Sequence, residues 1–185
     1  MIFREVEDRD LIPRARRGDV DAYNILVSRW EKRVYNYLLR LVKDREDALD
    51  LTQETFLKAY RYLARLEDVD RFSPWLYRIA HNESISMFRR NRLPTDDTEA
   101  EQPTSLAVSV GGSTVYPVEL ALSVERALES LTPEQREVVV LKVYQGFKFH
   151  EIAEIVSCPV STVKSRLYSA FGALKTTLAP VGRTS

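Results

Sequence analysis

The stretch FHEIAEIVSCPVSTVKSRLYS, residues 149–169, decides the fold of the C-terminal part of this chain. Its pattern predicts a short helix over residues 149–156, a turn over 157–160, and a longer helix capped by Ser161 and running to about Leu178. A short helix, a four-residue turn and a longer helix are the layout of a helix-turn-helix. Ser157 stands where such a turn often has glycine. The expected core of the motif is Ile152, Ala153, Val156, Cys158, Val160, Val163 and Leu167.

The second helix of this motif is expected to present a polar face near its start. A helix N-terminus carries positive partial charge and free N–H groups that suit phosphates. Lysine and arginine add electrostatic affinity for DNA, and polar side chains can read base edges in the major groove. The segment therefore predicts DNA binding, with an ordinary helical hairpin in a protein interface as the alternative. The candidate residues are Thr162, Lys164, Ser165, Arg166, Tyr168 and Ser169.

Working outward, two more helices precede the motif. The first is expected over residues 119–131. Thr132, Pro133 and Gln135 then form a capping box with proline just inside the helix start. Gly146 ends that helix as a left-handed cap.

Farther toward the N-terminus, apolar residues at three- and four-residue steps predict three amphipathic helices. Asp19 or Asp21 is available to cap the first, and Ser73, followed by Pro74, to cap the third. The third helix is expected to bury Leu76, Ile79, Ala80 and Met87. The apolar side of the first helix is expected to consist of Tyr23, Leu26, Trp30, Val34, Tyr37 or Leu38, and Leu41. That of the second is expected to consist of Ala48, Leu51, Thr55, Ala59, Tyr62 or Leu63, and Leu66.

Between the two helical blocks, residues 93–117 hold three prolines and two glycines without a sustained apolar period, which predicts a linker. No segment shows the alternation of a β-strand. We therefore expect an all-α protein. It would consist of a helical domain at 1–92, a flexible acidic linker at 93–117, a helix-turn-helix domain at 118–178 and a tail at 179–185.

The net charge of zero, from 27 basic and 27 acidic residues, hides a segregation. Residues 1–92 carry 19 basic and 16 acidic side chains, residues 93–119 none and 5, and residues 120–185 carry 8 and 6. Two weakly basic blocks thus flank an acidic connector. Zero net charge is therefore no argument against nucleic-acid binding.

Composition narrows the class of protein further. No apolar run approaches the roughly 18 residues of a membrane span, and a single cysteine excludes an internal disulfide, which favours the cytosol. Two histidines and one cysteine make a metal site improbable. With no phosphate-binding glycine loop or nucleophile–base pair, we expect no catalytic residue, no cofactor and no enzyme.

Two polar constellations lie on the N-terminal helices. Asp47, Asp50, Gln53 and Glu54 project from one helix face and suit a basic partner surface, although acids near a helix start also favour the dipole. On the next helix an exposed line is expected, flanked by aromatic residues. The alternative is that these aromatic residues are mostly core, which is the interpretation we favour for Trp75. Arginines with interleaved aromatics and an amide can hold phosphates and stack bases. The line is Arg78, Asn82, Ser86 and Arg89, and its flanks are Phe72, Trp75, Tyr77, Phe88, Arg90 and Arg92.

Five motifs, in order along the chain, resemble the extracytoplasmic-function, group 4, sigma factors of bacterial RNA polymerase. They are DLTQETFLKAY (50–60), FSPWLYRIAHN (72–82), LTPEQR (131–136), IAEI (152–155) and PVSTVKSRL (159–167). The resemblance implies a region 2 domain, a three- to four-helix bundle, before the linker. It implies a region 4 helix-turn-helix domain after it.

The resemblance also implies three sets of site residues. Docking to the β′ clamp helices of polymerase would use Asp47, Asp50, Gln53, Glu54 and Phe56. Capture of the melted −10 strand would use Leu66, Arg71, Phe72, Trp75, Arg78, Asn82, Ser86, Arg89 and Arg90. Binding of the −35 element would use Lys142, Thr162, Lys164, Ser165, Arg166, Tyr168 and Ser169. Ser86, Leu66 and Ser161 depart from residues frequent in the family.

The function implied is that of a promoter-specificity factor. Its expected partners are the polymerase core, through the β′ clamp helices and the β flap, promoter DNA, and an anti-sigma factor. The free protein is expected to be a cytoplasmic monomer without membrane insertion. The rival hypothesis is a self-sufficient helix-turn-helix regulator, which would form a stable dimer on a palindromic operator without polymerase.

Overall fold

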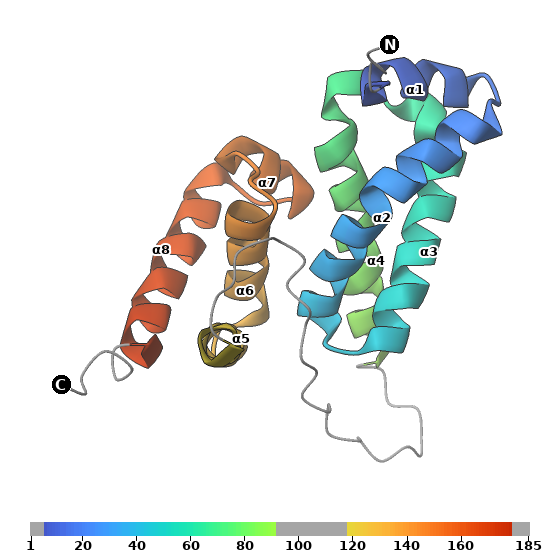
Figure 1. Ribbon diagram of the computed structural model, residues 1–185. Coiled ribbons are helices and arrows are strands. Elements are labelled where there is room, and N and C mark those ends of the chain that lie inside the picture. The colour runs from blue at the N-terminus through green and yellow to red at the C-terminus, as the bar shows by residue number, and fades with distance from the viewer. Residues whose placement is uncertain (1–5, 92–117, 179–185) are drawn as a thin grey trace, which may run out of the picture. The chain divides into compact units, whose positions relative to one another are not determined.

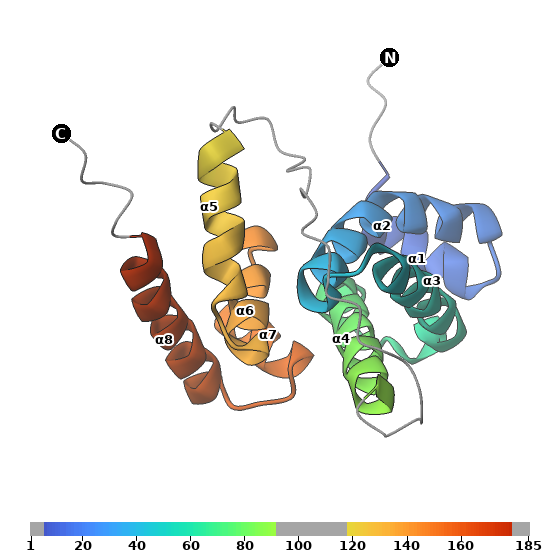
Figure 2. The same ribbon diagram turned by 90° about the horizontal axis from the view of Figure 1, so that it is seen from below.

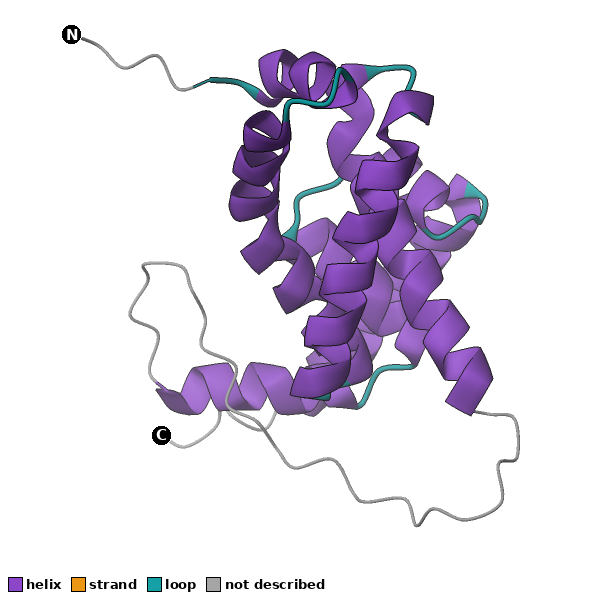
Figure 3. Cartoon of the chain, turned by 90° about the vertical axis from the view of Figure 1, so that its right-hand side faces the viewer, coloured by secondary structure: helices purple, strands orange, loops and turns teal. Residues whose placement is uncertain are grey.

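The computed structural model describes residues 6–91 and 118–178, with side chains from residue 123 onward in the second range. These residues form two helical units, and all of their regular structure is helical (Figure 1; Figure 3). This confirms the all-α, two-domain expectation. The linker expected at 93–117 and the tail from 179 lie outside the described residues.

The first unit contains four helices: α1 (Asp8–Arg16), α2 (Val20–Val42), α3 (Arg45–Tyr62) and α4 (Phe72–Asn91). Helix α2 packs against α1, α3 and α4, and α3 also packs against α4 (Figure 1). Two 3₁₀ turns, η1 (Leu63–Arg65) and η2 (Val69–Arg71), connect α3 to α4. The core is made of residues from all four helices.

Local sequence sets where α2 and α3 begin. The Asp19 carboxylate accepts from the Ala22 N–H at 3.0 Å, so Asp19, rather than Asp21, is the cap of α2. This bond, followed by the Arg14 side chain, lowers the pKa of Asp19. Asp44 caps α3 in the same way, accepting from the Asp47 N–H at 2.9 Å.

Three expectations for the first unit need correction. Helix α1 was not predicted, since Pro13 and five charged residues surround its buried Leu11 and Ile12. Helix α4 begins at Phe72, because turn η2 leads directly into it, so Ser73 is not its cap. Ile79 is only half-buried, whereas Tyr77 is fully buried.

The second unit contains α5 (Val118–Glu129), α6 (Pro133–Val139), α7 (Phe149–Ile155) and α8 (Val160–Leu178). Helices α5 and α6 both pack against α8 (Figure 2). Helix α6 continues into a π-helical segment, η3 (Val140–Tyr144). It ends before Gly146, whose φ of 76° confirms the predicted left-handed residue.

The capping box at the start of α6 is confirmed. The Thr132 hydroxyl accepts from the Gln135 N–H at 3.3 Å, and the Gln135 side chain accepts from the Thr132 N–H at 3.2 Å. Helix α8 starts at Val160, so Ser161 lies in its first turn and is not the cap. Ser157, in the turn before α8, has a φ of 50°, the left-handed conformation in which glycine is frequent.

A buried arginine holds the start of α6 against the end of α5. The Arg136 guanidinium donates to the carbonyl oxygens of Leu128, Glu129 and Leu131 at 3.0, 3.1 and 3.1 Å. The carbonyls of Leu128 and Glu129 belong to the last turn of α5, where a helix leaves carbonyls without a helical partner, and Leu131 lies in the turn that follows. Burial lowers the pKa of Arg136, but the group stays charged at neutral pH.

Candidate nucleic-acid interface

The acidic residues of α3 form one surface of the first unit. Asp50 and Gln53 are exposed, Asp47 and Glu54 are half-buried, and Glu54 lies 3.7 Å from Lys58. Partial burial, then the neighbouring carboxylates of Asp44 and Asp50, raise the pKa of Asp47. A cation bound here would relieve this repulsion. We call Asp47, Asp50, Gln53 and Glu54 the acidic face.

Phe56, expected in the same set, is only 8% exposed and belongs to the core. Its backbone carbonyl accepts a hydrogen bond from the buried Tyr23 hydroxyl at 2.5 Å, which ties α3 to α2. Phe56 therefore supports the acidic face from beneath. Two leucines that sequence reasoning missed lie on the surface instead: Leu49 is 51% exposed and Leu57 54%. The sequence pattern that could have identified them is their position four residues before and four residues after Gln53, which places them beside it on the helix.

A second surface follows α4. Arg78, Asn82 and Arg89 are exposed, as is Arg90 one position farther on. Asn82 and Arg89 are seven residues apart, which is almost two helical turns, so they lie on the same side of the helix. Position 85 lies between them on that side. Ile85 is 48% exposed, whereas Ser86 is half-buried. We call Arg78, Asn82, Ile85 and Arg89 the arginine line.

The aromatic residues beside this line are mostly core. The ring centroid of Phe72 lies 6.2 Å from that of Trp30 and 5.9 Å from that of Trp75, and the Tyr77 ring lies 5.1 Å from the Tyr37 ring at a tilt of 57°. Phe72 and Tyr77 are 2% and 0% exposed. Trp75 is half-buried, at the edge of the cluster. Trp75 can therefore offer a partly open ring, whereas Phe72 positions it.

The connection between α3 and α4 borders a groove of about 840 Å³. Leu66 is 5% exposed and anchors this connection in the core, and Arg71 is exposed at its end. Across the groove, Arg9 of α1 donates to the Asp70 carboxylate at 2.7 Å. The groove is lined by Val6, Glu7, Asp8, Arg9, Arg29, Trp30, Val69, Asp70, Phe72 and Ser73.

The groove has a fixed wall on the α2 side. The Trp30 indole N–H donates to the Asp8 carboxylate at 2.8 Å, and Arg29 binds the same carboxylate. These bonds hold the start of α1 on α2. A groove of this size, bordered by Arg9, Arg29 and aromatic rings, suits an unpaired nucleotide.

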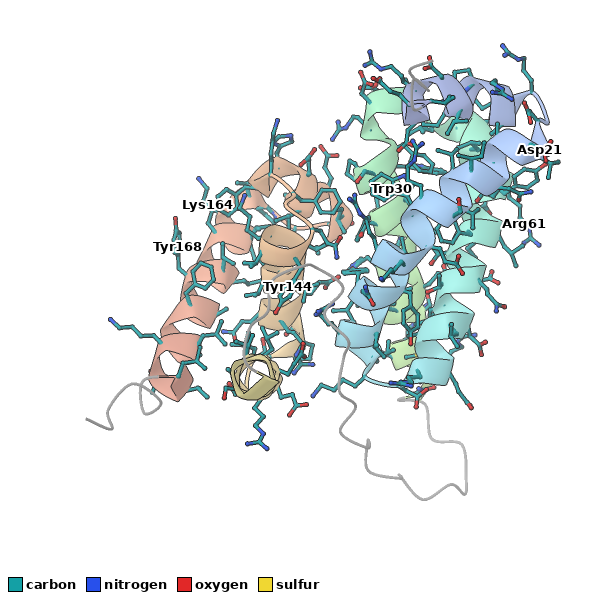
Figure 4. All side chains as sticks on the ribbon, in the orientation of Figure 1. Asp21, Trp30, Arg61, Tyr144, Lys164 and Tyr168 are labelled. Atoms are coloured by element: carbon teal, nitrogen blue, oxygen red, sulfur yellow. The ribbon has the colours of Figure 1, made fainter. Side chains whose placement is uncertain are left out.

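In the second unit, the expected DNA-reading residues lie on the outer side of α8. Lys164, Ser165, Tyr168 and Ser169 are exposed, Tyr168 by 65%, and Thr162 is half-buried. Figure 4 shows Lys164 and Tyr168 pointing away from the helices that pack on α8. The buried side of α8 consists of Val163, Leu167 and Ala170.

Contacts within the unit hold several of these side chains. Lys142 donates to the Phe147 carbonyl at 3.0 Å, and its ammonium lies 4.8 Å from the centroid of the Phe149 ring. Lys164 lies 5.5 Å from the same ring. Two cations thus gather beside one aromatic ring near the start of α8.

Two further α8 side chains have internal partners. Arg166 contacts the Cys158 sulfur at 3.9 Å, and the Ser169 hydroxyl accepts from the Gln135 side chain at 3.0 Å. These two residues are less free to reach DNA than Ser165 and Tyr168.

The described part of the chain contains no group of three or more His, Cys, Asp or Glu side chains placed to hold a metal ion. None of its helices is long and apolar enough to cross a membrane.

Comparison with known proteins identifies the family to which the chain belongs. Residues 26–93 match the family model of sigma-70 region 2, and residues 121–174 match that of sigma-70 region 4. The chain is 31% identical to the RNA polymerase sigma-H factor of Pseudomonas aeruginosa, over 98% of this chain and 99% of that protein. It is 32% identical to the ECF RNA polymerase sigma-E factor of Escherichia coli, over 97% and 98%.

A solved structure agrees with these matches. The sigma factor RpoE in complex with the anti-sigma factor NepR, from Bartonella quintana, superimposes with a TM-score of 0.70 at 26% identity. The match covers 87% of this chain and 98% of that one. The protein is thus of the class that directs RNA polymerase to promoters at transcription initiation. The chain belongs to the sigma-70 family, in its extracytoplasmic-function group, and is not an enzyme.

Proposed function

We propose that the two units divide promoter recognition between them. The first, residues 1–92, is region 2: it docks on the polymerase core and captures the melted −10 strand. The second, residues 118–178, is region 4: it binds the −35 element. Residues 93–117 connect the two and 179–185 form a tail. The observation that carries this proposal is that one small unit has an acidic face on α3 and an arginine line on α4.

The acidic face is proposed to dock on the β′ clamp helices of polymerase. Its exposed Asp50 and Gln53, and the half-buried Glu54, offer acceptors to basic side chains, with Leu49 and Leu57 supplying exposed apolar area on either side of Gln53. Apolar area beside polar and charged groups is typical of protein interfaces. Asp47 and the underlying Phe56 complete this site.

The arginine line and the groove are proposed to hold the −10 strand. Arg78, Arg89 and Arg90 would contact phosphates, Asn82 would bind a base edge, and the half-buried Trp75 would stack. Leu66 and Phe72 are buried and would position the loop, with Arg71 exposed beside it. Half-buried Ser86 would contribute less than the sequence predicted.

On α8, Lys164, Ser165 and Tyr168 are proposed to contact the −35 duplex, with Thr162 at the start of the helix. Lys142, Arg166 and Ser169 have partners within the unit and would act near phosphates or position their neighbours. Each unit would bind DNA weakly by itself. Tethering on polymerase would raise the effective concentration of each site.

Two further partners are proposed for this chain, the β flap of polymerase and an anti-sigma factor. The β flap of polymerase is proposed to bind the second unit. The RpoE–NepR complex supports an anti-sigma factor as a partner of this chain as well. Such a factor would cover the acidic face and so block polymerase docking. We propose a cytoplasmic protein that is monomeric when free.

Charge reversal at the acidic face tests the proposal. Asp50→Lys combined with Glu54→Lys should abolish pull-down of core polymerase, because both acceptors then repel a basic partner. The helical circular dichroism should be unchanged, since both side chains lie at the surface. Glu31→Lys, an exposed charge reversal on α2, is the matched control.

Unchanged pull-down by the double variant would refute the docking assignment. Tight, specific binding of promoter duplex by the free protein, without polymerase, would instead favour a self-sufficient helix-turn-helix regulator. Transcription by the reconstituted holoenzyme on a promoter library then identifies the −35 and −10 sequences.

A further inference from the structure

An ion pair joins α3 to α4, and its acidic member, Glu83, directly follows Asn82 of the arginine line. The Lys58 ammonium of α3 is 2.7 Å from a carboxylate oxygen of Glu83 on α4 and 3.7 Å from Glu54 of the acidic face. The Glu83 side chain is 11% exposed and that of Lys58 33%. The hydrogen bond to Glu83 raises the pKa of Lys58, so the ammonium is charged at neutral pH.

The position of Glu83 is unusual for a helix proposed to bind DNA. It is the single acidic residue among residues 72–91, a stretch with three arginines. It directly follows Asn82, which is exposed on the arginine line. A carboxylate there, without a neutralising partner, would repel the phosphates of a bound strand. Because the carboxylate is largely buried, the high dielectric constant of water would weaken this repulsion less than at an exposed site.

Lys58 supplies the neutralising charge from the neighbouring helix. We propose that Lys58 masks Glu83 and is thereby a positioning residue for the melted −10 strand; this rests on the proposed function of α4. Lys58 need not touch DNA, because it acts through the carboxylate that it covers. It also lies beside Glu54, so one side chain of α3 borders both the docking surface and the DNA-facing helix.

The pair has an asymmetry that makes the proposal testable. Removing Lys58 leaves a poorly solvated negative charge at the position next to Asn82, whereas removing both charges leaves none. We therefore expect Lys58→Met to weaken strand binding and Glu83→Gln, added to it, to restore binding. Lys58→Arg keeps the positive charge and should behave like the unmodified protein.

The experiment uses holoenzyme and a fluorescently labelled single-stranded −10 oligonucleotide of the non-template sequence found by transcription. Polymerase is saturated with each variant, as checked by pull-down. Lys58→Met should weaken binding roughly 2- to 15-fold, the effect of one charge about 10 Å from a phosphate at effective dielectric constants of 80 to 20. The double variant Lys58→Met/Glu83→Gln should bind within about twofold of the unmodified holoenzyme.

Two measurements separate masking from a loss of folding. Tryptophan fluorescence, which reports Trp30 and Trp75 of the first unit, checks that each variant is folded at the assay temperature. The ratio of the Lys58→Met affinity to the unmodified affinity should approach one as salt is raised, since screening weakens repulsion. A folding defect would not follow salt in this way.

The outcomes distinguish this inference from the assignment on which it rests. If Arg78→Ala and Asn82→Ala leave oligonucleotide binding unchanged, α4 does not hold the −10 strand and the proposed function fails. If those two variants weaken binding but Lys58→Met does not, masking is overturned. Masking is also overturned if Lys58→Met weakens binding and Glu83→Gln fails to restore it, since Lys58 would then contact the strand directly.

Discussion

The two helices proposed to meet DNA differ in how they are held. Helix α4 has 20 residues and buries nine of them, whereas α8 has 19 residues and buries three. A melted strand has little shape of its own, so the protein surface that captures it must be rigid beforehand. Duplex DNA is already shaped, and a helix with one exposed face is enough to read its major groove. The difference in burial fits this division of tasks.

The largest effect should come from breaking the core under α4. Leu76→Ala, at a position with 0% exposure, should lower the free energy of unfolding of the first unit by about 3 kcal/mol. Denaturant unfolding followed by tryptophan fluorescence measures this, since both tryptophans lie in that unit. Ile85→Ala, exposed on the same helix, is the control and should change stability by less than about 0.5 kcal/mol. Equal losses for the two variants would refute the picture of a rigid, deeply packed α4.

A smaller effect is expected from a substitution on the exposed side of α8, which should weaken DNA binding. Lys164→Ala should weaken holoenzyme binding to a duplex with the −35 element by about 1 kcal/mol and reduce the salt slope by about one. The free energy of unfolding should fall by no more than about 1 kcal/mol, because Lys164 is exposed and its contact with the Phe149 ring is the interaction lost. Lys175→Ala, exposed near the end of the same helix, should leave both quantities unchanged. An unaltered salt slope in Lys164→Ala would mean that the ammonium contacts no phosphate.

The smallest expected effect is a pH dependence of the free energy of unfolding that arises at the cap of α2, the helix on which α4 packs. The hydrogen bond from the Ala22 N–H, followed by the one from the Arg14 side chain, lowers the pKa of Asp19 below that of an ordinary aspartate. Because the folded pKa is the lower one, Asp19 contributes stability that is present above pH 4 and lost as pH falls through the folded pKa. Asp19→Asn keeps the cap but does not titrate, so the stability difference between the two proteins should shrink below pH 4. Denaturant midpoints measured from pH 6 downward test this, and a constant difference would contradict it.

Local rules explain what the sequence could predict. The caps at Asp19 and Thr132 and the left-handed Gly146 are encoded within a few residues, and the structure has each of them. Helix α1 was missed because its apolar content is small and Pro13 lies inside it. The shift of the exposed line from Ser86 to Ile85 is a matter of one helical position.

The contacts that position the candidate site are of another kind. Lys58 meets Glu83 across 25 positions of sequence, and Gln135 meets Ser169 across 34. Spacing within a helix carries no information about such partners, because they depend on how helices pack. Burial of Phe56 and Leu66 likewise depends on neighbouring elements. Residue types in a pattern could therefore identify the surfaces, but not which side chains are free on them.

The bond between Gln135 and Ser169 has a consequence for how promoter preference can evolve. The Gln135 side chain closes the capping box with Thr132 and also donates to the Ser169 hydroxyl on α8. A substitution at Ser169 that suits a new −35 sequence would remove an acceptor from a group that stabilises the start of α6. Within the part of the chain that the structure describes, the side chains of Ser165 and Tyr168 form no such hydrogen bond that a substitution would remove. New promoter specificities should therefore arise first at Ser165 and Tyr168, with Ser169 changing late in a lineage and together with Gln135.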